Sequence, residues 1–162
     1  MDTQPLPTAS SPRPAPRAGR PIRAFHLGLA TRGGEPLFED FNAARTMAAC
    51  LHEATLAGDG RMLAWVVMPE RVHCLLQSGG ARPLRDAVAA FKSGSARRVN
   101  RAIGRSGPLW EPAWEDHALR ADADLRSVAR CIVANPLRAG LVRRIADYPF
   151  WNAIWLGDTG AA

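Results

Sequence analysis

The feature that most constrains the fold is an apolar run that a proline interrupts halfway. Residues 62–68 (Met-Leu-Ala-Trp-Val-Val-Met) have the length of a strand and carry no polar break, which predicts a strand buried on both faces. Pro69 and Glu70 follow, and proline cannot donate a hydrogen bond to a sheet ladder. The second run, residues 71–77, therefore predicts a neighbouring strand joined to the first by a tight turn.

Residues in the second run alternate in character. Strand side chains point to opposite faces in turn, and this assigns Val72, Cys74 and Leu76 to one face and Arg71, His73, Leu75 and Gln77 to the other. A histidine two positions from another ligand would place two donors on one side of a metal ion. Here that partner position holds arginine, whose guanidinium has no lone pair to give.

Length and composition predict a single folded domain. The chain has 162 residues, 47% of them hydrophobic and 22% charged, enough to bury most of its apolar surface. The net charge of +6 comes almost wholly from arginine, because Lys92 is the only lysine. Arginine matches phosphate geometry, so nucleic acid is the leading partner class. A genome that favours arginine codons explains the same composition, and composition alone leaves both explanations open.

Cysteine usage and hydropathy bear on the compartment. Cys50, Cys74 and Cys131 are odd in number, and none belongs to a CxxC pair, which favours a reducing cytoplasm over a disulfide scaffold or a zinc finger. No stretch approaches the roughly 20 apolar residues of a transmembrane helix, and the N-terminus lacks the apolar segment of a secretory signal. We therefore expect a cytoplasmic protein without a membrane partner.

We expect three regions along the chain: a flexible basic arm at 1–21, a folded domain at 22–156 and a tail at 157–162. The elements expected in the domain are a strand at 24–31, a helix capped by Asn42, the two strands described above, a helix from Pro83 to about Ile103, a strand within 109–120, a helix capped by Asp122 and an aromatic segment at 148–152 packed on the body. This order predicts an α+β, ferredoxin-like split βαβ fold. Its antiparallel sheet of about four strands carries two helices on one face and leaves the other free for a partner.

The long helix predicted from Pro83 carries a basic flank. Ser95 lies in the middle of its apolar stripe, where a larger or apolar residue would be expected. The flank comprises Arg97, Arg98, Arg101 and Arg105. Such a flank is either a solvated face or a surface that follows a phosphate backbone, and the sequence leaves both open.

Several polar residues have alternative readings. His73 is a lone strand histidine or, with Asn100 or a carboxylate, a weak ligand for Mg²⁺ or Mn²⁺. Ser95 becomes a nucleophile only if its helix packs on the face of His73, which would then serve as base. Trp110 and Trp114 either stack on bases or pack in the core. Adjacent strand residues alternate in direction, so residues 115–117 (Glu-Asp-His) cannot all converge on one site.

Five short motifs occur in order along about residues 22–152. They are Phe25-His26-Leu27, Val67-Met68-Pro69-x-x-Val72-His73, Lys92-Ser93-x-x-Ala96-Arg97-x-x-Asn100, Gly104-Arg105-Ser106-Gly107-x-x-Trp110 and Asn135-Pro136-Leu137-Arg138-Ala139-Gly140-Leu141-Val142. Together they resemble the REP-associated tyrosine transposases, relatives of the small single-tyrosine insertion-sequence transposases. The resemblance implies the split βαβ sheet and the binding and cutting of hairpins in single-stranded DNA. It also implies a His-hydrophobic-His pair that holds Mg²⁺ or Mn²⁺, and a helix tyrosine that attacks the phosphate.

The sequence departs from that pattern at two positions. The first histidine of the pair falls at Arg71, and the tyrosine falls at Ser95 or, in a variant register, at Gly94. The single tyrosine, Tyr148, lies in the C-terminal tail. His73 remains, with Asn100 as a further candidate metal ligand. An arginine at position 71 puts a positive charge near the place of the metal, where it can still neutralise a phosphate.

We therefore expect a bacterial, transposase-fold protein that binds single-stranded or hairpin DNA of REP-type elements, with strand cleavage impaired or lost. The expected DNA contacts are Arg71, Lys92, Arg97, Arg98, Arg101, Arg105 and Trp110. The alternatives are a DNA-nicking transposase with a hydroxyl nucleophile such as Ser95, a domesticated DNA- or RNA-binding regulator, and a structural remnant. Monomer and homodimer both remain open.

Overall fold

The computed structural model describes residues 23–54 and 60–155. The expected arm at 1–21 and the tail at 157–162 lie outside the described residues. So does most of the Gly58-Asp59-Gly60 stretch at which we expected the first helix to stop. Instead, that helix ends earlier, at Glu53.

The element order follows the predicted plan and extends it at the C-terminus. The strands are β1 (Arg23–Ala30), β2 (Gly60–Met68), β3 (Arg71–Ser78), β4 (Glu115–Ala118) and β5 (Trp151–Ala153). The α-helices are α1 (Phe41–Glu53), α2 (Leu84–Ile103), α3 (Leu125–Val133) and α4 (Asn135–Arg138). The 3-10 turns are η1 (Arg32–Gly34), η2 (Leu37–Glu39) and η3 (Ile145–Asp147). The mixed α+β class is therefore confirmed.

Within the described residues the strands form one five-stranded antiparallel sheet with the order β4-β1-β3-β2-β5. The turn at Pro69 and Glu70 joins β2 to β3, as the sequence predicts. The central strand β3 buries Val72, Cys74 and Leu76 on one side. This alternation assigns every later side chain to a face, because the residues paired directly across neighbouring strands point the same way.

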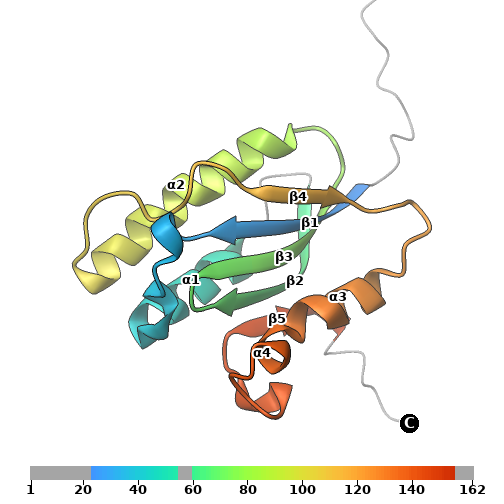
Figure 1. Ribbon diagram of the computed structural model, residues 1–162. Coiled ribbons are helices and arrows are strands. Elements are labelled where there is room, and N and C mark those ends of the chain that lie inside the picture. The colour runs from blue at the N-terminus through green and yellow to red at the C-terminus, as the bar shows by residue number, and fades with distance from the viewer. Residues whose placement is uncertain (1–22, 55–59, 156–162) are drawn as a thin grey trace, which may run out of the picture.

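Each face of the sheet carries its own core. One core joins Leu27, Val67 and Val72 to residues of α1 and α2. The other joins Val66 and Leu75 to residues of α3 and of the C-terminal segment. In Figure 1, α3 and α4 lie beside β2 and β5, away from α2. The sheet thus lies between two unequal helical layers.

Two expectations about the sheet need correction. It has five strands rather than about four, because the aromatic tail does not merely pack on the body but adds β5 beside β2. Its second face is not wholly free, because α3 packs over β2 and β3. The strand expected within 109–120 is short, Glu115–Ala118. Ahead of it, Trp110 makes only an isolated bridge to Thr31.

Both helix caps lie two residues from the expected positions. Asp40, not Asn42, caps α1, and its Oδ1 accepts the Ala43 N–H at 2.9 Å. Asp124, not Asp122, caps α3, and its Oδ1 accepts the Arg126 and Ser127 N–H groups. Either residue type is a good cap in isolation, so the packing of the helix start decides between the near neighbours.

The α1 cap gives a stability prediction. Asp40→Ala should lower the free energy of unfolding by about 1 kcal/mol, because an orphan amide at the helix start loses its acceptor. Asn42→Ala, the matched control at the position that the sequence favoured, should change it by less than about 0.5 kcal/mol. Urea unfolding of both variants measures the difference. Equal losses would contradict the assignment of Asp40 as the cap.

Candidate nucleic-acid interface

The second sheet face is left partly uncovered beside α3. Helix α3 packs against β2, β3 and β5, whereas several side chains that β1 and β4 present to this face are half-buried or exposed. They include His26 from β1 and Glu115 and His117 from β4, next to Arg71 and His73 from β3. We call these five residues the histidine face. Asp116 is paired with Leu27 and lies on the opposite side of the sheet, so the predicted alternation in 115–117 is confirmed.

Two imidazoles of the histidine face touch. His26 Nε2 lies 3.3 Å from His73 Nδ1, and His117 stands beside His26 with ring centroids 6.1 Å apart. The sequence analysis assigned His26 to a strand but did not connect it with His73. The missing information was the β1–β3 register, which pairs Gly28 with His73 and His26 with Leu75. That register brings two histidines 47 positions apart into diagonal contact.

Both touching imidazoles are disfavoured as cations. The pKa of His73 is lowered to about 4, chiefly by burial and then by the neighbouring His26 and Arg71, while Glu115 opposes them. Burial also lowers the pKa of His26, followed by the effect of His117. Near pH 7 each ring is therefore neutral and offers one N–H donor and one acceptor nitrogen. The positive charge at this site comes from arginine.

Gly28 lies beneath side chains at the centre of the histidine face. It is paired with His73 on one side and Glu115 on the other. A Cβ at this position would lie 3.3 Å from Glu115 Oε2 and 3.9 Å from His73 Nδ1. Glycine therefore lets the Glu115 side chain pack closely against the backbone of β1. Arg71 reaches the same carboxylate at a loose 3.9 Å.

The helical side of the site comes from α3 and α4. The potential nucleophiles on α3 are the hydroxyl of Ser127 and the thiol of Cys131. Ser127 Oγ donates to Asp124 Oδ2 at 2.8 Å, whereas Cys131 is exposed. Arg138 of α4 donates to the carbonyl of Cys131 and is close enough to His73 to lower its pKa. A second arginine thus borders the histidine face.

Ser95 lies on the other side of the sheet. Its helix α2 packs on the Val72 face, so His73 cannot serve as its base and the condition set for a serine nucleophile fails. The side chain is 2% exposed, accepts the Trp110 Nε1–H at 3.1 Å and donates to the Lys92 carbonyl at 3.3 Å. Its hydroxyl satisfies a buried indole, which explains a polar residue in an apolar stripe.

The expected metal ligands do not converge. Asn100 lies on α2, where its Nδ2 donates to the Gly107 carbonyl at 2.9 Å and its Oδ1 accepts from Arg105 at 3.3 Å. His73 points to the opposite face. Across residues 23–54 and 60–155, no group of three His, Cys, Asp or Glu side chains is arranged to hold a metal ion. The His73 and Asn100 donor set therefore does not fit the metal that the family resemblance implies.

Much of the expected DNA-contact set on α2 and the following loop is engaged within the protein. Arg98 pairs with Glu53 at 2.7 Å, Arg105 with Glu35 at 3.5 Å, and Arg97 donates to Ser93. Lys92, another member of the set, donates to the Glu111 and Pro112 carbonyls. Arg101 is exposed. Trp110 is 6% exposed, so of its two readings the structure supports core packing.

Comparison with known proteins finds similarity to transposases in sequence and in fold. No family model matches the chain. The REP-associated tyrosine transposase of Escherichia coli K12 is 32% identical over 89 residues, which are 54% of this chain and 50% of that protein. A REP-associated tyrosine transposase solved bound to a REP hairpin superposes with a TM-score of 0.61 at 23% identity, covering 88% of this chain and 81% of the other.

A putative transposase from Deinococcus radiodurans superposes with a TM-score of 0.54 at 26% identity, covering 76% of this chain and 97% of that one. The chain is similar to a REP-associated tyrosine transposase in sequence over about half of its length, and to transposases in fold. The resemblance given by the motifs is thereby confirmed. The matched segment spans about half the length of the E. coli relative. Within the described residues of the present chain, no helix is long and apolar enough to cross a membrane.

Position 95 gives a second stability prediction. Ser95→Ala should cost about 1–3 kcal/mol, because the buried Trp110 indole loses its acceptor. Ser95→Tyr should cost at least as much, because a phenol does not fit a site that is 2% exposed. Ser93→Ala on the exposed side of α2 is the control and should be nearly neutral. Thermal and urea unfolding measure all three variants. A stable Ser95→Tyr protein would contradict this account of the site.

Proposed function

We propose that this protein binds hairpin or single-stranded DNA through the histidine face and the adjoining arginine of α4, and does not cleave it by a tyrosine mechanism. The observation that carries the binding proposal is that Arg71 and Arg138 both lie near the touching imidazoles of His26 and His73. The similarity to a transposase solved with a REP hairpin supports DNA as the partner.

The site can bind a phosphate without a metal ion. Arg71 is 34% exposed and its contact with Glu115 is loose at 3.9 Å, so an incoming phosphate can compete for the guanidinium. A guanidinium binds a phosphate through two parallel N–H bonds. His26 and His73 are neutral and share one hydrogen bond, so one of the two rings keeps a further N–H to donate to a phosphate. Arginine here takes over the charge neutralisation that a metal would otherwise supply.

Tyr148 supports loss of the phosphotyrosine reaction. It is the only tyrosine in the sequence. Its hydroxyl donates to the Val67 carbonyl, its ring packs edge-on against Phe150 with centroids 6.2 Å apart, and burial raises its pKa to about 12. A phenol held in this way fastens the C-terminal segment to β2. It is neither ionised nor free to attack a phosphate.

The alternative of an active nicking enzyme needs another nucleophile. Ser95 is buried on the side of the sheet opposite the histidine face. The Ser127 hydroxyl donates to the capping residue Asp124. Cys131 is the exposed thiol on the helix that lies over the correct face. We therefore favour binding without cleavage, the domesticated-binder alternative.

Binding should depend on Arg71. Arg71→Gln should lower the affinity for a REP-type DNA hairpin about tenfold, because a charge-assisted hydrogen bond contributes about 1.5 kcal/mol or more. Arg45→Gln, an exposed arginine on α1, is the matched control and should bind like the natural protein. Addition of EDTA should leave the affinity unchanged. Gel shifts at a fixed salt concentration measure each arm.

A rival surface tests the same proposal. The triple substitution Arg97→Gln, Arg98→Gln and Arg101→Gln removes the basic flank of α2 that the sequence analysis favoured. If this variant loses binding while Arg71→Gln retains it, the DNA path runs along α2 and the histidine face is not the interface. If Arg71→Gln alone loses it, the histidine face is supported.

Strand cleavage should be absent. Incubation with hairpin DNA and Mn²⁺, followed by a denaturing gel, should show no covalent protein–DNA adduct, because the single tyrosine is held by β2. An adduct would refute this part of the proposal. Cys131→Ala and Ser95→Ala, run beside the natural protein, would then identify the attacking residue by loss of the band.

A further inference from the structure

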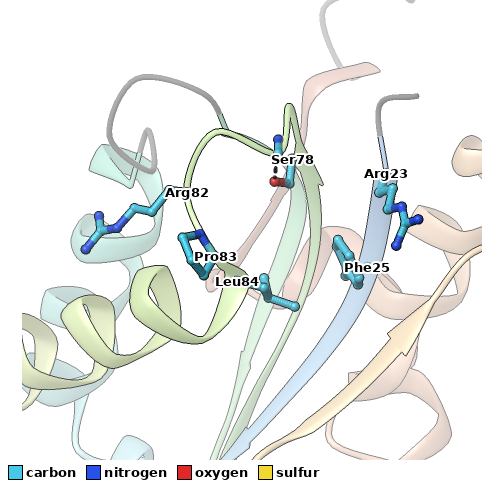
Figure 2. A pocket seen from close by; sticks show the side chains of 7 residues that line it. Arg23, Phe25, Ser78, Arg82, Pro83 and Leu84 are labelled. Atoms are coloured by element: carbon cyan, nitrogen blue, oxygen red, sulfur yellow. Dashed lines mark hydrogen bonds between the residues drawn. The ribbon is translucent and has the colours of Figure 1, made fainter. Parts of the chain in front are cut away.

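A cavity lies at the end of the sheet where β1 begins and β3 ends. Its volume is about 250 Å³. The lining residues come from three segments that the fold brings together: Arg23 and Phe25 of β1, Ser78 at the end of β3 with Gly80 after it, and Arg82, Pro83 and Leu84 at the start of α2. Figure 2 shows the Phe25 ring pointing from β1 toward Leu84 across this space.

The two parts of the cavity differ in chemistry. Phe25, Pro83 and Leu84 make an apolar wall, and Phe25 and Leu84 are only partly buried although they adjoin the first core. Arg82 extends away from the cavity (Figure 2), and its guanidinium donates to the Asp86 carbonyl at 3.3 Å. Arg23 lies on the β1 side of the cavity and is exposed. An aromatic wall beside one exposed guanidinium suits a planar ring that carries a phosphate.

Size restricts the ligand to a small one. Pockets for drug-sized ligands usually measure about 300–1,000 Å³, and this cavity of about 250 Å³ is smaller. A single nucleotide matches it better than a dinucleotide. Ser78 adds a hydroxyl whose oxygen accepts the Gly80 N–H, so its own proton is available to a ring nitrogen or carbonyl.

The location links the cavity to the histidine face. Ser78 lies five residues beyond His73 on β3, a distance of about 17 Å along the strand. A few unpaired nucleotides are enough to cover that distance. The cavity lies on the α2 side of the sheet and the histidine face on the other side. A DNA strand that reaches both would therefore pass around the end of the sheet where β1 begins.

We propose that this cavity holds one unpaired nucleotide of a bound DNA strand, with the base on Phe25 and the phosphate at Arg23. The proposal rests on the proposed function and adds a base-holding site to it. The base would come from the single-stranded flank of a hairpin. The hairpin itself would stay on the histidine face.

The test uses a hairpin with a single-stranded flank, the same hairpin without it, and a series of flanks with one abasic position each. Kd is measured for the natural protein and for Phe25→Leu, which keeps apolar bulk but removes the stacking surface. One abasic position should weaken binding to the natural protein about tenfold. The Phe25→Leu protein should bind the intact flank about tenfold more weakly than the natural protein does. The abasic position should weaken its binding no further, because the substitution and the abasic position remove the same contact.

Two controls accompany the test. Phe41→Leu replaces an exposed phenylalanine of α1, 62% exposed, and should leave every affinity unchanged. Arg23→Gln should weaken flank binding about threefold to tenfold and reduce the salt slope by about 0.7. Since Arg23 is exposed, this second variant keeps the proposal testable even if Phe25→Leu unfolds.

The outcomes separate the two proposals. If the natural protein binds flanked and unflanked hairpins equally, the nucleotide-cavity proposal alone is wrong. The same holds if the loss of affinity at an abasic position adds to the loss caused by Phe25→Leu. A natural protein that binds neither hairpin would overturn the proposed function and the cavity's role with it. A free deoxynucleotide monophosphate that binds as tightly as the flank would assign the cavity to a metabolite and overturn the strand proposal.

Discussion

The side-chain alternation of β3 is the constraint on which the rest of the molecule depends. Val72 and Cys74 are buried against α1 and α2, and Leu75 against α3. A slip of one residue in this strand would turn Arg71 and His73 into the first core and expose the apolar set. The energetic cost of burying a guanidinium is large, so the register is firmly specified. The polar groups of the histidine face are held in place by the burial of their neighbours.

Local sequence signals were enough to predict the fold in outline. The apolar run at 62–68, the turn at Pro69 and the helix from Leu84 to Ile103 all appear where the patterns place them. The errors concern long-range packing. The aromatic segment at 148–152 joins the sheet because its backbone pairs with β2, and the Tyr148 hydroxyl donates to the Val67 carbonyl. Nothing in the local pattern distinguishes such a segment from one that only rests on the body.

The site was less predictable than the fold. Ser95 and Asn100 were grouped with His73 on the expectation that the long helix packs on the face of His73, yet the helix packs on the Val72 face and the sheet separates them. His26 belongs with His73 because of strand register, which a single sequence does not encode in any short window. Cys131 and Arg138 follow from the position of α3, an element whose face of attachment was not predicted. Residue identity could be read from the sequence, whereas the side of the sheet on which each residue lies depended on the packing of helices around it.

The two edges of the sheet have a bearing on how the protein behaves at high concentration. β4 has four residues and β5 has three, and β4 carries Glu115, Asp116 and His117 with every side chain exposed. Short edges with charged side chains offer a poor template for another chain to extend the ladder. The long apolar strands β2 and β3 are enclosed in the interior of the sheet. A protein whose most aggregation-prone segments are shielded in this way should stay free of edge-to-edge aggregation at high concentration.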